Sequence, residues 1–118
     1  MSILLEFNKT PQFLIVMITG EWTLTDVLKS IEDIKTESDK QEAKLILLDL
    51  QGLSSPDSEM TRFYSGEKIA SVFGSFYKIA GYSQIEKINR FAETVAINRY
   101  ANFKMFTSET DAINWLQS

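Results

Sequence analysis

The sequence predicts an α/β fold in which helices pack on a four- to five-stranded, mostly parallel mixed sheet. One uninterrupted apolar run, Leu-Ile-Leu-Leu at residues 45–48, is typical of a strand covered on both faces. Other apolar segments alternate with segments whose apolar residues recur at the spacing of an amphipathic helix. The predicted order is β-β-α-β-α-β-α-β-α, and each helix supplies the crossover connection that a parallel strand requires.

The chain begins with a predicted β-hairpin. Residues 3–7 and 13–19 are rich in the apolar and β-branched side chains that favour strands. The turn between them contains Pro11, whose ring fixes its own φ angle. Gly20 ends the second strand.

A helix with one buried face is expected next. It begins behind a cap at Thr23 or Thr25, and its apolar stripe comprises Leu24, Val27, Leu28, Ile31 and Ile34. Residues 36–42 carry several charges and no large apolar side chain. They are interpreted as a solvated connection to the central strand, with an acidic docking patch as the alternative.

The central strand, residues 44–50, leads through the loop 51–57 into a second helix. Ser55 and Pro56 suit the N-cap and the first position of that helix. Gly66 near its middle indicates close packing, a kink or a break. The predicted apolar face contains Met60, Phe63, Ala70 and Phe73.

The last third predicts two further strands, at residues 76–82 and 102–106. The amphipathic helix between them has an apolar face of Ile85, Ile88, Phe91, Ala92, Val95 and Ala96. A final helix follows the capping-box pattern that runs from Ser108 to Asp111. It is expected to dock on the sheet through Ala112, Ile113, Trp115 and Leu116.

Composition narrows the function. The 118 residues form one predicted domain, 1–118, with no Cys and no His, which excludes thiolate, disulfide and imidazole chemistry. No cofactor and no metal are predicted. The net charge of −4 argues against nucleic acid as a partner. The longest apolar run, residues 13–18, is too short for a membrane span of ~20 residues, and without a secretion signal the protein is expected to be cytoplasmic.

The predicted working surface lies where the parallel strands end. In open α/β sheets, the loops at the carboxyl ends of the strands form the usual binding edge. Here these loops are residues 20–23, residues 51–57 and Ser83. We therefore expect them to form one neighbourhood.

Several motifs resemble a known family in their order and spacing. Ile-Thr-Gly-Glu-Trp-Thr at residues 18–23 is similar to the family's strand ending in Gly-Glu, and Leu-Leu-Asp-Leu-Gln-Gly-Leu at residues 47–53 is similar to its aliphatic-Asp-aliphatic strand. Residues 77–80 resemble the next strand, and residues 106–116 its Phe, acidic, Ala, Trp-Leu ending. The chain thus resembles the STAS superfamily, the sulphate-transporter and anti-sigma-factor-antagonist domains, and most closely its SpoIIAA-like branch.

The resemblance implies a non-enzymatic protein-interaction or regulatory module, switched at the loop after the central strand. In the antagonist proteins an Asp-Ser pair opens the following helix and carries the phosphorylatable Ser, and Asp57-Ser58 match that pair. A small residue and Gly follow that Ser in the family, whereas Glu59-Met60 follow it here, so a plain helix-capping role for Ser58 is the alternative. The predicted switch or partner contacts are Ser58, Asp57, Ser55 and Ser54, supported by Gly20, Glu21, Asp49 and Gly52.

Other functions remain open on the residues alone. A small hydrophobic-ligand or lipid carrier would need a closed apolar cavity of ~300 Å³ or more; its candidate lining is Trp22, Phe63, Tyr64, Phe73, Phe76 and Tyr82. A carboxylate-based enzyme would use Asp49 or Asp57 in a shared cleft, although Asp49 also suits a structural role at the turn. With Glu21, these carboxylates could instead bind Mg²⁺. Exposed edge strands also allow a homodimer.

Overall fold

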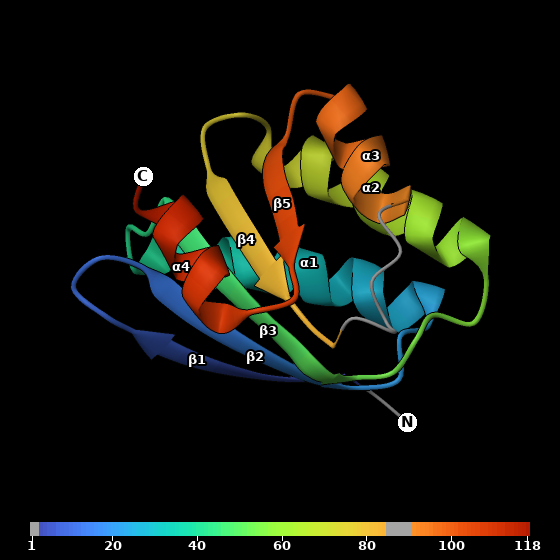
Figure 1. Ribbon diagram of the computed structural model, residues 1–118. Helices are drawn as coiled ribbons and strands as arrows, with labels where there is room; N and C mark the ends of the chain where they lie inside the picture. Colours follow the sequence, from blue (N-terminus) through green and yellow to red (C-terminus); the bar gives the residue numbers. More distant parts are fainter. Residues whose placement is uncertain (1–2, 85–90) are drawn as a thin grey trace.

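The computed structural model describes residues 3–84 and 91–118, which form one five-stranded sheet and four helices (Figure 1). The strands are β1 (Leu4–Lys9), β2 (Leu14–Gly20), β3 (Leu45–Leu53), β4 (Lys78–Tyr82) and β5 (Asn102–Phe106). The helices are α1 (Leu24–Lys40), α2 (Glu59–Phe73), α3 (Phe91–Asn98) and α4 (Glu109–Leu116). The predicted fold class and element order are confirmed.

The strands lie in the sheet in the same order as in the chain, β1-β2-β3-β4-β5. β1 pairs antiparallel with β2, and every later pair is parallel. β3 is therefore the central strand, as its apolar run predicts. The parallel strands all end at one edge of the sheet, the edge predicted to bind partners.

Helices cover both faces of the sheet (Figure 1). Residues of α1, α2 and α3 share the larger core with Ile46 and Leu48 of β3. Ala112 and Leu116 of α4 lie in a second core with Leu47, which points to the opposite face. Successive residues of β3 thus belong to different cores, which explains its unbroken apolar sequence.

α1 is longer than predicted, because the charged residues 36–42 are mostly helical rather than a connection. Lys35 and Asp39 form an ion pair at the i, i+4 spacing that stabilises helices, with Nζ and Oδ2 2.6 Å apart. Ser38 is fully buried, and its hydroxyl donates to the Ile34 carbonyl oxygen at 2.7 Å. A hydroxyl satisfied in this way can face the core, so this turn needs no large apolar residue.

α2 begins at Glu59 behind Ser58, so the predicted start at Ser55 and Pro56 is wrong. Met60, expected on the buried face, is 54% exposed. The buried stripe instead recurs every four residues, at Thr61, Ser65, Ile69 and Phe73. The prediction considered only apolar residues, so it placed Met60 on the buried face and left out the buried hydroxyl residues Thr61 and Ser65. Ala70 and Phe73 are buried as predicted.

Gly66 does not break α2, which is continuous through it. A Cβ added there would lie 2.4 Å from the Ala92 carbonyl oxygen of α3. Close packing is thus the correct one of the three alternatives.

The remaining predictions concern the last third of the chain. Ser108 caps α4 as predicted, because its side chain accepts from the Asp111 N–H at 3.3 Å. Ile85 and Ile88, the start of the predicted third apolar face, lie outside the described residues. Within the described ranges, no helix is long and apolar enough to cross a membrane.

Candidate functional site

The loops at the carboxyl edge contact one another as predicted. The Ser54 N–H donates to the Gly20 carbonyl oxygen at 2.9 Å, and the Trp22 N–H donates to Ser54 Oγ at 3.3 Å. From the third loop, Ser83 Oγ donates to the Leu50 carbonyl oxygen at 3.4 Å. These bonds join the loops after β2 and β3 to each other, and they tie the start of the loop after β4 to β3 itself.

Ser58 lies at the start of α2, where its side chain is available to solvent. Its Oγ accepts from the Thr61 N–H at 3.2 Å, the bond of a helix N-cap. Thr61 is buried, and its hydroxyl donates to Asp57 Oδ1 at 2.5 Å. Asp57 and Ser58 are therefore fixed relative to each other through one buried threonine. Both groups sit at the positive end of the 15-residue helix dipole.

Ser54 and Ser55 have different surroundings. Ser54 holds two loops together, because its Oγ accepts from Trp22 and donates to the Ser55 carbonyl oxygen at 3.2 Å. Ser55 is exposed in the middle of the bend. All three predicted serines are exposed, and Ser54 in addition holds the backbone of the two loops together.

The two supporting glycines shape this edge. Gly20 has a φ of 124°, which side-chain-bearing residues rarely adopt, and its carbonyl oxygen accepts the bond from Ser54. Gly52 pairs with Thr19, and a Cβ at Gly52 would lie 2.6 Å from Thr19 Cγ2. Glu21, in the loop after β2, is exposed. The glycines allow the close approach of β2 and β3 that brings the loops together.

Asp49 has the structural role that the sequence left as an alternative. Its Oδ1 accepts from the Gln51 N–H at 3.1 Å and from Gln51 Nε2 at 3.3 Å, within β3 and beside the register shift between β2 and β3. Asp49 pairs in register with Tyr82, on the sheet face that carries α4. Burial, followed by the nearby carboxylates of Asp49 and Glu109, raises the pKa of the Tyr82 phenol. Tyr82 OH donates to Glu109 Oε2 at 3.1 Å.

The structure does not bring Asp49 and Asp57 into a shared cleft. Asp57 bonds to α2, which covers the face opposite α4, so the two carboxylates serve different sides of the sheet. Among residues 3–84 and 91–118, no cluster of three or more acidic side chains could hold a metal ion. The described residues therefore form neither the shared cleft that a carboxylate enzyme would need nor the acidic cluster that a Mg²⁺ site would need.

Solved structures that align over nearly the whole chain share its fold. An anti-sigma factor antagonist from Mycobacterium paratuberculosis covers 99% of this chain and 96% of its own, with a TM-score of 0.66 and 13% identity. An uncharacterised protein with a SpoIIAA-like fold from Shewanella loihica covers 98% and 94%, with a TM-score of 0.61 and 19% identity. The chain has the SpoIIAA-like fold.

SpoIIAA itself, an anti-sigma factor antagonist solved in its unphosphorylated form, aligns over 99% of both chains, with a TM-score of 0.53 and 16% identity. No protein-family model and no curated protein matches the sequence. The resemblance expected from the sequence motifs is thus confirmed at the level of the fold.

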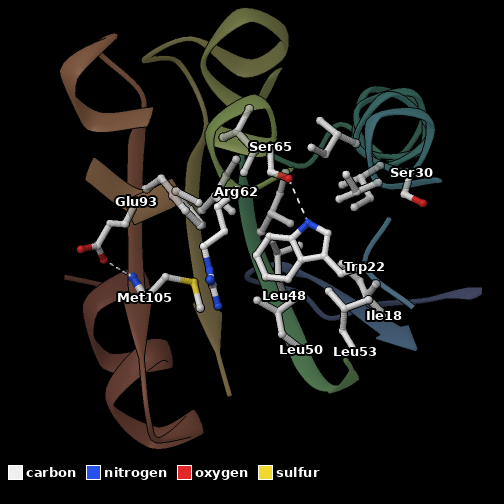
Figure 2. A pocket seen from close by; sticks show the side chains of 18 of the residues that line it. Ile18, Trp22, Ser30, Leu48, Leu50, Leu53, Arg62, Ser65, Glu93 and Met105 are labelled. Carbon is white, nitrogen blue, oxygen red and sulfur yellow. Dashed lines mark hydrogen bonds between the residues drawn. The ribbon is translucent and has the colours of Figure 1, made fainter. Parts of the chain in front are cut away.

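Beneath the loop edge, the SpoIIAA-like fold of this chain encloses a small cavity between the sheet and α1, α2 and α3 (Figure 2). Its volume is about 80 Å³, and its lining is mostly apolar. A carrier was expected to need ~300 Å³, so the cavity is too small for a lipid or a drug-sized ligand. Of the predicted aromatic lining only Trp22 and Phe73 take part, whereas Phe76 is 85% exposed.

Three polar residues at this cavity were missed by the sequence reasoning. Ser65 accepts from Trp22 Nε1 at 2.9 Å, and Figure 2 shows Arg62 beside that indole, with its guanidinium 5.7 Å from the ring. Glu93 is buried and accepts from the Met105 N–H at 2.5 Å. The four-residue spacing of Thr61, Ser65 and Ile69 was the available signal for Ser65. It places the serine on the same face as an apolar residue.

Proposed function

We propose that this chain is a cytoplasmic, non-enzymatic regulatory module that binds a protein partner at the carboxyl edge of its sheet. The observation that carries this proposal is the exposed Ser58, placed at the N-terminus of α2 and linked through Thr61 to Asp57. Two of the structural neighbours described above are anti-sigma factor antagonists, which supports a regulatory role. The absence of Cys and His from the sequence is also consistent with binding rather than catalysis.

The docking surface has both apolar and acidic parts. Met60 is 54% exposed and Tyr64 is 38% exposed, and their i, i+4 spacing puts them on one outer face of α2. Asp57 and Glu59 flank Ser58 at the start of that helix. A partner with an apolar pocket rimmed by basic groups would complement this surface.

Phosphorylation of Ser58 would change this surface by electrostatics. A phosphate adds about −1.5 to −2 charges, and it would lie between the carboxylates of Asp57 and Glu59. The helix dipole would partly compensate for that charge, whereas the hydroxyl cap on the Thr61 N–H would be altered. We propose that this change in charge controls partner affinity.

Photocrosslinking from position 60 tests the surface. A benzophenone amino acid there should capture a protein partner that the same group at position 29, an exposed position of α1 on the side that borders β1, does not capture. Calorimetry with the purified partner should then show weaker binding for Met60→Ser and an altered affinity for Ser58→Glu. Lys29→Gln, a change at an exposed α1 residue outside the proposed surface, should bind like the wild type.

The outcomes distinguish the proposed switch at Ser58 from the proposed docking surface. Equal binding by Ser58→Glu and wild type would remove the switch but leave the docking surface. Equal binding by Met60→Ser would overturn the docking surface on α2, and turnover of a metabolite by the pure protein without any partner would overturn the interaction module itself.

A further inference from the structure

One basic side chain, that of Arg62, lies within reach of Ser58 on α2. Arg62 is the only Lys or Arg in residues 54–66. The two residues are four apart, the spacing that puts side chains on one face of a helix. Helical side chains also point back toward the N-terminus, so the Arg62 side chain runs in the direction of Ser58. A negative charge on Ser58 would therefore have this guanidinium as its counter-charge in the first turns of the helix.

The ion pair of Arg62 shows that its guanidinium already lies near the start of the helix. Arg62 Nη1 is 2.6 Å from Oε1 of Glu59, the residue that follows Ser58. The Arg62 side chain is only 12% exposed, whereas that of Glu59 is 59% exposed. Because residues 58 and 59 are neighbours, a shift of the guanidinium from the carboxylate to a phosphate on Ser58 needs only side-chain rotation.

The same guanidinium also contacts the loop after β2. Its carbon atom lies 5.7 Å from the centre of the Trp22 ring, within the range of a cation–π contact, and Figure 2 shows the two side chains next to each other. The indole N–H donates to Ser65 Oγ at 2.9 Å, and the backbone N–H of Trp22 donates to Ser54 Oγ at 3.3 Å. Arg62 thus connects the start of α2 with the residue at which the loops after β2 and β3 are joined.

The acidic residues around Ser58 explain why a phosphate there needs a cation. Asp57 and Glu59 are its sequence neighbours, and both carboxylates would repel a phosphate. Asp57 is held in place, because its Oδ1 accepts from the Thr61 hydroxyl at 2.5 Å. The dipole of α2 offsets part of this repulsion, whereas the guanidinium of Arg62 supplies a full positive charge.

We propose that phosphorylation of Ser58 draws Arg62 away from Trp22, so that a charge on the loop after β3 changes the contacts of the loop after β2. This inference rests on the switch proposed above and names the residue that transmits it. A phosphate carries about −1.5 to −2 charges and three acceptor oxygens, so it attracts the guanidinium more strongly than the single carboxylate of Glu59 does. The indole then keeps its two hydrogen-bond anchors but loses the cation beside its ring.

Phosphoserine inserted at position 58 during translation tests this proposal on the whole chain, without a kinase or a partner. A Trp115→Phe background leaves Trp22 as the only tryptophan. In phosphorus NMR titrations, the second pKa of the phosphate should be about one pH unit lower with Arg62 than in Arg62→Gln, and Arg62→Lys should restore part of that difference. Trp22 fluorescence should change on phosphorylation when Arg62 is present and stay constant in Arg62→Gln.

Lys68→Gln is the matched control, because it removes one positive charge from the same helix at a residue that pairs with Glu32 of α1. It should leave the phosphate pKa and the Trp22 response as they are with Lys68, and circular dichroism should show that all variants are folded. A phosphate pKa that is the same with Arg62 and in Arg62→Gln, or a Trp22 emission that phosphorylation leaves unchanged, would overturn the proposal. Equal affinity of the phosphorylated and unphosphorylated chains for the partner would instead refute the switch at Ser58, whatever the titration shows.

Discussion

Replacing Gly66 with alanine tests whether α2 is fixed by its own sequence or by its contact with α3. An alanine Cβ would lie 2.4 Å from the Ala92 carbonyl oxygen and 3.0 Å from Val95 Cβ. The first of these atoms belongs to backbone, so no side-chain rotation can relieve the clash and the helices must move apart. Overpacking of this kind costs about 3 kcal/mol at the upper end of its usual range.

Intrinsic helix propensity acts in the opposite direction. Alanine is favoured over glycine in a helix interior by about 1 kcal/mol. The two effects leave a net loss of about 2 kcal/mol in the free energy of unfolding for Gly66→Ala. For a chain of 118 residues, this corresponds to a melting temperature about 8 °C lower.

Urea unfolding followed by circular dichroism measures this loss directly. Ser71→Ala is the control, because Ser71 is exposed on the same helix and the change should alter stability by only a few tenths of a kcal/mol. Whether Gly66→Ala lowers or raises the free energy of unfolding decides whether the contact with α3 or helix propensity dominates at this position. A variant Gly66→Ala that unfolds at a higher urea concentration than the wild type would show that α2 and α3 are not in close contact at this point.

Three further changes give distinct expected results. Ser58→Ala should lower the free energy of unfolding by about 0.5–2 kcal/mol through loss of the cap, and Ser58→Gly by only a few tenths, as urea midpoints would show. Leu116→Ala, at a side chain that is 1% exposed in the α4 core, should cost about 2–5 kcal/mol in the same assay; a loss under about 1 kcal/mol would mean that α4 is loosely docked. The folded pKa of Tyr82 is raised above its ordinary value near 10, so its contribution is complete below about pH 10 and is lost as pH rises toward the folded pKa. Urea midpoints of the wild type should therefore fall more steeply than those of Tyr82→Phe above about pH 10, and parallel curves would contradict the assignment.

The apolar patterns predicted the architecture because burial dictates them directly. The unbroken run in β3 requires cover on both faces, and the structure supplies it from α4 on one side and three helices on the other. The capping pattern at Ser108 was sufficient for α4, because the signal is contained within four residues. Such features depend on local spacing alone.

The start of α2 could not be predicted in the same way. Ser55-Pro56 and Ser58-Glu59 both satisfy the local rules for a helix start. The choice depends on contacts distant in sequence: β3 continues to Leu53, which is buried, and Ser54 then bonds to the loop after β2. The chain reaches the helix layer only after these contacts are made.

The candidate edge was predictable in its location but not in its details. Parallel strands place their carboxyl ends together, so the location of this edge followed from the element order. The separation of Asp49 from Asp57 depended on which sheet face each residue meets, and the exposure of Met60 depended on the buried hydroxyls of Thr61 and Ser65. Neither is encoded in residue type alone.

The agreement between strand order in the sheet and strand order in the chain has a consequence for biosynthesis. Each new strand pairs with the one made just before it, so the sheet can grow in the direction of translation without waiting for a distant segment. Each parallel pairing therefore closes a single crossover of about 24 to 33 residues and never a longer one, which limits the loop-closure cost of this parallel sheet. The sheet surface that α4 covers must stay open until residues 109–116 have been made, because α4 follows β5 in the chain.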